Sequence, residues 1–340
     1  MRSLWFVEPG KLEWRDVEEP RLHGPGEALV RPTAVAACDL DGAVVRGLAP
    51  IPGPYAFGHE FAGEVVEVGG EVTSFAPGDR VAVSFQIFCG TCDRCRRGLT
   101  ANCQGEGVPY RAMYGFGALG GHEWGGAFSD LVRVPFAEVM LFPVPEEVEP
   151  ATLATASDNI TDGWSRVAPA LEGAHGGAEV LVVGGWAASI PLYAVDVARA
   201  LGAARVVYID GNPERRAAAE SYGAETMDAL PERKAGRFGV TVDASGMPEG
   251  LAVALRSTEP GGVCTSIGIY YAPTPVPLLE MYDNGITFVT GRPHVGPMLP
   301  RVIDLVASGR IDPDRIRTTV PWDEAADALA DPPTKLVAVR

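Results

Sequence analysis

Four cysteines gather in one short segment of the sequence. Cys89, Cys92 and Cys95 are each separated by two residues, and Cys103 follows shortly afterwards. Two-residue spacers allow tight turns between ligands, and four thiolates can close a tetrahedron around Zn²⁺. Sulfur would then fill every coordination position and leave none for a substrate. The segment therefore predicts a structural zinc lobe at about residues 85–105.

A second candidate metal site consists of residues that lie far apart in the sequence. Cys38, His59 and Asp158 offer a thiolate, an imidazole nitrogen and a carboxylate. A catalytic zinc ion uses three such protein ligands and keeps its fourth position open. Taken singly, a cysteine is usually a small core residue and a histidine is usually a hydrogen-bonded group. Spacing alone leaves the choice between a metal site and these ordinary roles open.

A glycine turn follows a predicted strand at residues 179–183. Gly184, Gly185 and Trp186 stand between that strand and a helix, which is the context of a Rossmann dinucleotide fingerprint. Trp186 takes the place of the second glycine, where a side chain would crowd the pyrophosphate. Asp210 ends the next strand, where a carboxylate binds the ribose hydroxyls of NAD and repels the 2′-phosphate of NADP. NAD is therefore the predicted cofactor, and NADP is the less favoured one.

Further cofactor contacts are predicted where later strands end. Ser245 and Gly268 follow two of these strands, at the carboxyl edge where open α/β sheets bind their ligands. Arg215 is also predicted to contact the cofactor.

The elements that must position these residues change in type along the chain. In the first 150 residues, short β-segments alternate with Gly and Pro turns, which favours a barrel-like all-β unit. After about residue 175, strands and helices alternate, which predicts βαβ units and a parallel sheet. Strands are expected at 27–32, 63–68, 80–84, 129–134, 179–183, 205–209, 240–243, 263–267 and 286–290, and helices at 192–201 and 213–223.

The composition argues against two classes of partner. The chain of 340 residues carries 28 Lys and Arg against 44 Asp and Glu, a formal net charge of −16. Such a protein repels nucleic-acid phosphates and anionic membrane surfaces, so neither is expected as a partner. We find no signal-peptide pattern and no uninterrupted apolar segment long enough to span a membrane. A cytoplasmic protein is expected, whose six cysteines stay reduced.

The order of the motifs resembles that of the zinc-containing medium-chain alcohol dehydrogenases. Gly58-His59-Glu60 is followed by Gly63, by Pro77-Gly78-Asp79-Arg80-Val81, by the cysteine lobe and by the βαβ segment. The resemblance extends over essentially the whole chain. It implies an α/β protein with a GroES-like β-barrel catalytic domain at residues 1–158 and 292–340. It also implies a Rossmann domain, a doubly wound parallel sheet, at residues 159–291.

The resemblance also implies roles for the dispersed metal site. Cys38 and His59 match the family's first two catalytic zinc ligands, and Asp158 falls on the third. Glu60 matches an acidic residue that lies beside the ligands or moves onto the metal, and Asp41 resembles the carboxylate that orients the ligand histidine.

Two further functional predictions concern a single lysine and a loop. Lys335 resembles a basic residue of the family that reaches the cofactor pyrophosphate. Residues 120–124 are a candidate substrate loop, because functional residues favour loops held by a scaffold.

The sequence departs from the family pattern at three points. Leu40 stands where many members have Ser or Thr, whose hydroxyl passes the alcohol proton outward, and leucine cannot relay a proton. Trp186 replaces the second fingerprint glycine, and the third falls on Ser189 or on Pro191. Water or a carboxylate such as Glu60 would have to carry the proton, unless the reaction differs from alcohol oxidation.

The motifs together predict a zinc-dependent oxidoreductase that transfers hydride between NAD and a secondary alcohol, polyol or sugar-like substrate. The departures keep a second hypothesis open, a non-redox zinc lyase, hydratase or isomerase on a degenerate dehydrogenase scaffold. A third is a non-enzymatic interaction protein. The expected ligands are two zinc ions per chain, NAD and a small-molecule alcohol or carbonyl substrate, and the expected assembly is a homodimer or homotetramer.

Overall fold

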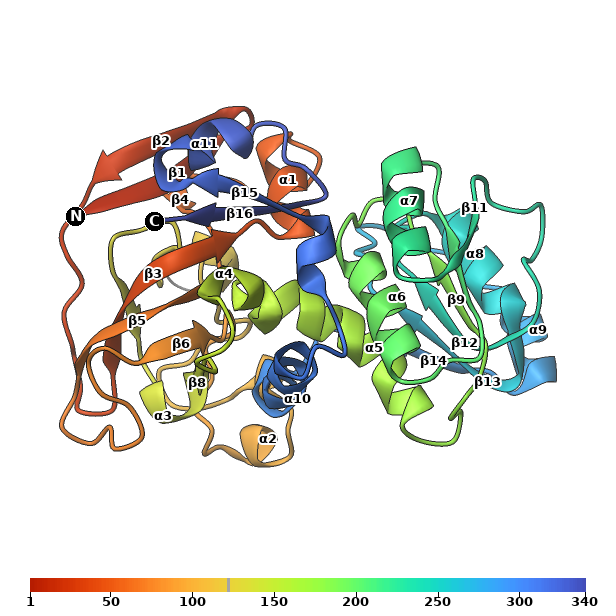
Figure 1. Cartoon of the computed structure of the whole chain (residues 1–340), viewed down its shortest axis with the longest axis horizontal. Helices are drawn as coiled ribbons and strands as arrows, with labels where there is room; N and C mark the ends of the chain where they lie inside the picture. Colours follow the sequence, from red (N-terminus) through yellow and green to blue (C-terminus); the bar gives the residue numbers. More distant parts are fainter. Residues whose placement is uncertain (121–122) are drawn as a thin grey trace. The chain divides into compact units, whose positions relative to one another are not determined.

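The structure is a computed structural model that describes residues 1–120 and 123–340, and it divides into two compact units (Figure 1). Unit 1 consists of Met1–Thr161, His294–Ser308 and Arg317–Arg340, and unit 2 consists of Asp162–Pro293 and Gly309–Ile316. Across the described residues, no helix is both long and apolar enough to cross a membrane.

Unit 1 is built on a mainly antiparallel sheet with the strand order β15-β16-β3-β5-β6-β8, and β7 pairs with β3. A smaller sheet has the order β2-β1-β4. The strands are β1 (Arg2–Glu8), β2 (Lys11–Asp16), β3 (Ala28–Ala36), β4 (Tyr55–Ala56), β5 (Glu60–Val68), β6 (Arg80–Val83), β7 (Val132–Val134), β8 (Leu141–Pro143), β15 (Arg317–Pro321) and β16 (Lys335–Val339). The helical segments are α1 (Asp39–Val45), α2 (Asp93–Arg96), η1 (Thr100–Asn102), η2 (Gly117–Gly120), α3 (Ala137–Met140), α4 (Pro150–Leu153), a π-helical turn (Ala156–Ile160), α10 (Val295–Ala307), η5 (Trp322–Glu324) and α11 (Ala325–Ala328).

The pairing of β3 with β5 positions the dispersed metal site. Ala36 pairs with Glu60 in the antiparallel register. Cys38 lies two residues after the end of β3 and His59 directly precedes β5, so the register brings the two residues to the same end of the strand pair. Pro32 lies inside β3 where the register shifts, which accommodates a residue that has no N–H to donate.

Unit 2 is a parallel sheet with the strand order β11-β10-β9-β12-β13-β14. Its strands are β9 (Val180–Val183), β10 (Val206–Ile209), β11 (Glu225–Met227), β12 (Phe238–Asp243), β13 (Thr258–Ser266) and β14 (Thr287–Thr290). Its helical segments are α6 (Ile190–Ala200), α7 (Pro213–Ser221), α8 (Pro248–Ser257), α9 (Leu278–Asn284) and η4 (Pro313–Ile316), and α5 (Thr161–Leu171) begins at the end of unit 1. Every residue of β9, β10 and β12 is buried, as expected where helices cover both faces of a sheet.

The predicted α/β fold is confirmed, and the strand order reverses beside β9, because β10 and β12 flank it. Ligands of open α/β sheets bind at such a switch point, beyond the carboxyl ends of the strands. The glycine turn at Gly184 leaves β9 at that edge.

The structure divides the C-terminal part differently from the sequence-based boundary, which assigned residues 292–340 wholly to the catalytic domain. Residues 309–316 belong to unit 2. The N–H of Asp312 donates to Asp196 of α6 at 2.8 Å, and the hydroxyl of Tyr222 donates to the Asp312 carbonyl at 3.0 Å. Arg310 also donates to the Ala200 carbonyl at the end of α6, at 2.6 Å. These long-range hydrogen bonds leave no local sequence pattern.

Candidate metal centres and cofactor site

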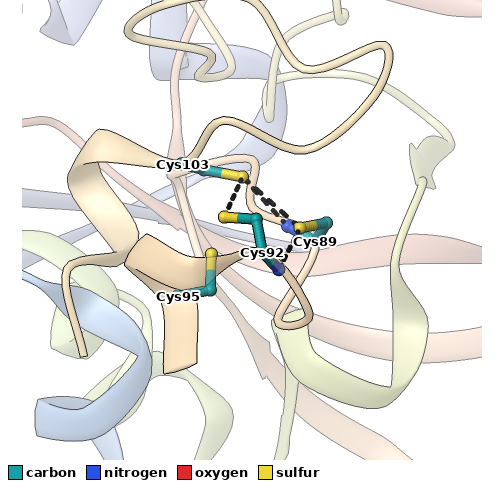
Figure 2. A group of neighbouring side chains, drawn as sticks. All are labelled: Cys89, Cys92, Cys95 and Cys103. Atoms are coloured by element: carbon teal, nitrogen blue, oxygen red, sulfur yellow. Dashed lines mark hydrogen bonds between the residues drawn. The ribbon is translucent and has the colours of Figure 1, made fainter. Parts of the chain in front are cut away.

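The structure brings the four lobe cysteines together, and Figure 2 shows their side chains gathered around one point. All four sulfurs lie within 4.8 Å of one another. The Sγ atom of Cys103 is 3.6 Å from that of Cys89 and 4.0 Å from that of Cys92. Four sulfurs bound tetrahedrally at the usual Zn–S length of about 2.3 Å would be about 3.8 Å apart. The cluster therefore fits a zinc ion.

Main-chain donors around the lobe favour the thiolate form. The N–H of Gln104 donates to Sγ of Cys92 at 3.4 Å. With the N–H of Cys95, it lowers the pKa of the Cys92 thiol to about 6. A Cβ atom at Gly105 would lie 2.6 Å from Sγ of Cys89, so this turn has no room for a side chain. All six cysteines are free of disulfides, as a metal-binding lobe requires.

A second group of possible metal ligands lies inside unit 1. Cys38, His59, Glu60 and Asp158 each offer one ligand atom, and these atoms lie within 4.8 Å of one another. Cys38 precedes α1, His59 and Glu60 lie at the start of β5, and Asp158 lies on the π-helical turn. π-Helical turns often occur at functional sites. One sulfur, one imidazole and two carboxylates form a donor set that suits zinc.

His59 lies between two carboxylates. Its Nε2 is 3.1 Å from Oδ2 of Asp158, and its Nδ1 is 3.6 Å from Oδ1 of Asp41. Burial lowers the pKa of His59, but the charges of Asp41 and Asp158 outweigh it and raise that pKa to about 9. Among the described residues, His59 Nδ1 and Asp41 Oδ1 have no hydrogen-bond partner, although both are buried. A small movement would bring Asp41 Oδ1 within hydrogen-bond distance of His59 Nδ1. Nε2 of His59 would then remain directed at the other possible metal ligands.

Asp41 also holds the segment that carries Cys38. Its Oδ2 accepts the main-chain N–H of Cys38 at 2.9 Å, and Sγ of Cys38 accepts the N–H of Leu40 at 3.5 Å. One carboxylate therefore fixes the start of α1 and faces His59, the geometry expected of a residue that orients a metal ligand.

We expect Asp41→Asn to weaken metal binding at this cluster by about 10- to 100-fold, because the charge that orients His59 is lost while the side-chain shape is kept. Competition between the protein and a chelator of known affinity measures this effect. Glu64→Gln is the matched control, because Glu64 is a half-exposed carboxylate on β5 outside the ligand cluster. Unchanged metal affinity in Asp41→Asn would rule out the orienting role.

Lys335 contacts residues beside the ligand cluster, whereas the sequence predicts a contact with the cofactor pyrophosphate. Its side chain is 1% exposed, and its Nζ lies 2.7 Å from Oε2 of Glu60 and 2.7 Å from the Ala37 carbonyl. Burial raises the pKa of Glu60 to about 8, and the Lys335 charge opposes that rise. The observed role of Lys335 is thus to pair with Glu60 beside the ligand cluster. Its contact with a pyrophosphate stays a prediction.

Two aromatic rings border the ligand cluster. The ring centroids of Phe116 and Phe85 lie 4.8 and 5.5 Å from that of His59. Both phenylalanines are buried and contribute an apolar wall. In the candidate substrate loop at 120–124, Gly121 and His122 lie outside the described residues, while the Trp124 indole donates to the Gly120 carbonyl at 3.3 Å.

In unit 2, the glycine turn after β9 is tightly packed. A Cβ atom at Gly184 would lie 2.5 Å from Oδ2 of Asp210, and one at Gly185 would lie 2.8 Å from the main chain of Ser245. Trp186 follows with an exposed side chain, and its N–H donates to the Ser245 carbonyl at 3.0 Å. The structure therefore brings these predicted cofactor residues to one edge of the sheet.

Asp210 is held by a network that the sequence analysis described only in part. Oδ2 accepts the Tyr208 hydroxyl at 2.5 Å, and Arg215 donates to both carboxylate oxygens at 2.8 and 2.7 Å. Arg215 also donates to the Gly185 carbonyl at 3.1 Å. The two-residue spacing of Tyr208 and Asp210 could have predicted their contact, because residues two apart on a strand share a face.

Ser245 and Gly268 lie around a second buried carboxylate, Asp243. Asp243 accepts the Ser245 hydroxyl at 2.6 Å, the Ser266 hydroxyl at 2.8 Å and the Tyr270 hydroxyl at 2.8 Å. A Cβ atom at Gly268 would lie 2.7 Å from the Tyr270 ring. The sequence analysis missed Tyr270, whose place beside the β12 end depends on how the loop after β13 folds back.

Known proteins share the domains and the fold of this chain. Residues 24–146 match the alcohol dehydrogenase GroES-like domain, and residues 190–308 match the zinc-binding dehydrogenase domain. A probable zinc-binding alcohol dehydrogenase of Mycobacterium tuberculosis is 30% identical over 338 residues, covering 97% of this chain and 85% of that protein. An L-threonine 3-dehydrogenase of Pyrococcus horikoshii is 30% identical over 340 residues, covering 94% and 90%.

A solved structure extends the similarity to the whole architecture. The alcohol dehydrogenase TADH from Thermus sp. ATN1 aligns with a TM-score of 0.88 at 30% identity, covering 100% of this chain and 99% of that one. Relatives and domain matches of this extent confirm the resemblance drawn from the motifs. The chain belongs to the zinc-type alcohol dehydrogenases of the medium-chain dehydrogenase family.

Proposed function

We propose that this enzyme is a zinc-dependent oxidoreductase that transfers hydride between NAD and a secondary alcohol, a polyol or a sugar-like substrate. The observation that carries the proposal is the buried cluster of Cys38, His59 and Asp158, with Glu60 beside it. In this assignment unit 1 carries catalysis and unit 2 carries the dinucleotide. The acidic third ligand and the His59-Glu60 pair resemble polyol and sugar members of the family, which supports the substrate class.

The three proposed ligands are Cys38, His59 and Asp158, and the lobe cysteines would hold a second, structural zinc ion. Zinc at the first site would act as a Lewis acid on the substrate oxygen, and a nicotinamide would accept the hydride from the substrate carbon. Asp41, whose Oδ1 lies 3.6 Å from Nδ1 of His59, would orient the imidazole. Phe85 and Phe116 supply an apolar wall beside His59, which strengthens electrostatic interactions there.

The substrate hydroxyl proton needs an acceptor that Leu40 cannot provide. We assign this proton to water or to Glu60, whose carboxylate lies in the ligand group and whose Oε2 is 2.7 Å from Lys335 Nζ. In the balanced reaction, the alcohol loses a hydride to NAD and a proton to this acceptor, and a carbonyl compound is formed.

The proposal is tested with zinc-loaded protein and secondary alcohols and polyols deuterated at the carbinol carbon. Deuterium should appear in the reduced nicotinamide, as measured by mass spectrometry, and omission of NAD should stop the reaction. Turnover of a substrate without nicotinamide would contradict hydride transfer and support the non-redox zinc lyase, hydratase or isomerase.

For the cofactor, we propose NAD rather than NADP, with Asp210 at the adenosine ribose. Asp210→Ser should lower the preference for NAD at least about tenfold, because it removes a repulsive charge and frees Arg215 to bind a 2′-phosphate. Titration calorimetry with both cofactors measures the ratio. Asp228→Ser, at the exposed end of the neighbouring strand β11, should leave it unchanged. Tighter binding of NADP by the wild type would contradict this role of Asp210.

For the assembly, we propose a homodimer or homotetramer that associates through unit 2. The strand β14 ends the described order of the sheet, and residues 269–289, which include α9 and part of β14, carry several exposed apolar side chains. They are Ile269, Tyr271, Val276, Leu278, Leu279, Tyr282 and Val289. Such a patch beside an edge strand suits association with a second copy.

We expect Leu279→Glu to convert the assembly into monomers, because a charge buried in an apolar contact lacks a partner. Light scattering coupled to size-exclusion chromatography gives the mass. Leu48→Glu introduces the same charge at an exposed leucine of unit 1 and should not change the mass. A monomeric wild type at the concentrations of the activity assay would contradict the proposed assembly.

A further inference from the structure

The carboxyl edge of unit 2 has two different sides. At a switch point, one half of a dinucleotide lies over the strand on one side of the first strand, and the other half lies over the strand on the opposite side. Here β10 flanks β9 on one side, and β12 and then β13 follow on the other. Asp210 and Arg215 mark the β10 side, where the proposed function places the adenosine ribose.

On the β12 side, Trp186 lies against the loop that follows the strand. A Cβ atom at Gly246 would lie 3.3 Å from both Cβ and Cδ1 of Trp186, so the indole begins directly over this loop. The side chain of Trp186 is 56% exposed, and it therefore takes up space above the loop instead of filling the core.

Main-chain hydrogen bonds hold this arrangement in place. The N–H of Trp186 donates to the Ser245 carbonyl at 3.0 Å, and the N–H of Ala187 lies 3.4 Å from the Ala244 carbonyl. These donors follow the glycine turn, where a dinucleotide fold usually presents N–H groups to a pyrophosphate. In this chain they are directed at the β12 loop.

Tyr270 takes up the neighbouring position, where β13 ends. Its ring lies against Gly268, at 2.7 Å from the place of a Cβ atom. Its hydroxyl donates to Oδ2 of Asp243 at 2.8 Å and lies 3.2 Å from the Met247 carbonyl. The hydroxyl therefore ties the ring across the ends of β12 and β13, over Gly268, which the sequence analysis assigned to the cofactor.

We propose that Trp186 and Tyr270 occlude the half of the nucleotide site on the β12–β13 side, so that the enzyme holds NAD mainly through its adenosine half. This inference rests on the proposed function for the presence of an adenosine nucleotide at Asp210. The nicotinamide half of NAD enters only when the two aromatic side chains move aside. The free energy of that movement weakens the binding of NAD. An adenosine monophosphate needs no such movement.

The test compares AMP with NAD by titration calorimetry on the zinc-loaded full-length protein. The wild type should bind NAD no more than about tenfold more tightly than AMP. Trp186→Gly should strengthen NAD binding about tenfold, with a change of less than about twofold for AMP. Tyr110→Gly is the control, because Tyr110 is an aromatic residue with 64% exposure in a turn of unit 1, and it should change neither affinity.

A second variant keeps the test independent of how Trp186→Gly folds. Tyr270→Phe keeps the ring but removes the hydroxyl that ties it to Asp243, while Ser245 and Ser266 still donate to that carboxylate. It should also strengthen NAD binding relative to AMP, by about threefold or more.

Three results would overturn the inference. NAD bound a hundredfold or more tightly than AMP by the wild type would show an open second half, and it would leave the proposed function intact. An unchanged ratio of NAD to AMP affinity in both variants would show that the aromatic residues do not occlude the site. If neither nucleotide binds, both this inference and the proposed NAD-dependent function fail.

Discussion

Replacement of Cys95 by serine should remove one zinc ion per chain and lower the melting temperature by roughly 10 °C or more. Structural zinc contributes about 10–16 kcal/mol of apparent binding energy in small zinc domains, which is comparable with the total stability of many folded proteins. The lobe is also hydrogen-bonded to the start of α10 and to His294, which directly precedes it. The N–H of Ala101 donates to Nδ1 of His294 at 3.2 Å, and the N–H of Gly296 donates to the Thr100 hydroxyl at 3.3 Å. Loss of the lobe therefore disturbs a larger part of unit 1.

Calorimetry, zinc analysis and limited proteolysis measure this effect, and new cleavage is expected within residues 85–105. Cys264→Ala is the matched control, because Cys264 is a buried cysteine of unit 2 outside both metal clusters. It should keep its full zinc content. A Cys95→Ser protein with unchanged zinc content and melting temperature would show that the lobe is not a metal site.

Asp158→Ala should lower kcat/KM at least about a thousandfold and leave the melting transition largely unchanged. A Lewis acid contributes several kcal/mol to transition-state stabilisation, and each 1.4 kcal/mol corresponds to about tenfold in rate. The variant should also contain one zinc ion fewer per chain, because Asp158 is the only proposed catalytic ligand on the π-helical turn.

Two further substitutions separate ligation from shape at this position. Asp158→Asn keeps the size of the side chain but loses the charge, and it should behave like the alanine variant. Asp158→Cys restores an anionic ligand and should recover zinc and part of the activity, because a cysteine thiolate is a common zinc ligand. A collapsed fold in both Asp158→Ala and Asp158→Asn would make Asp158 a structural residue.

The two metal clusters differ in how much of each could be predicted from the sequence. The lobe depends on ligands within one short segment, so spacing alone predicts it, and the structure brings all four sulfurs together. The dispersed cluster depends on the pairing of β3 with β5 and on a π-helical turn. Neither leaves a local pattern, and the family resemblance was needed to associate Cys38 with His59 and Asp158.

The hydrogen-bond and ion-pair partners of the charged residues were the feature least predictable from the sequence. Lys335 follows a proline-containing segment that gives no indication of Glu60, because their contact depends on the return of the chain to unit 1. Tyr208 could have been linked to Asp210 from the two-residue period of a strand. The contact of Tyr270 with Asp243 depends on a loop conformation that periodicity does not describe.

The proposed activity depends on a catalytic zinc ion at Cys38, His59 and Asp158 that is separate from the structural zinc of the lobe. The decisive measurement of these two sites is the zinc content per chain before and after dialysis against a chelator. We predict two zinc ions before dialysis and one afterwards, with activity lost, the melting transition largely retained and activity restored by added zinc. One zinc ion or none in carefully prepared, active wild-type protein would rule out a catalytic zinc ion at these three residues.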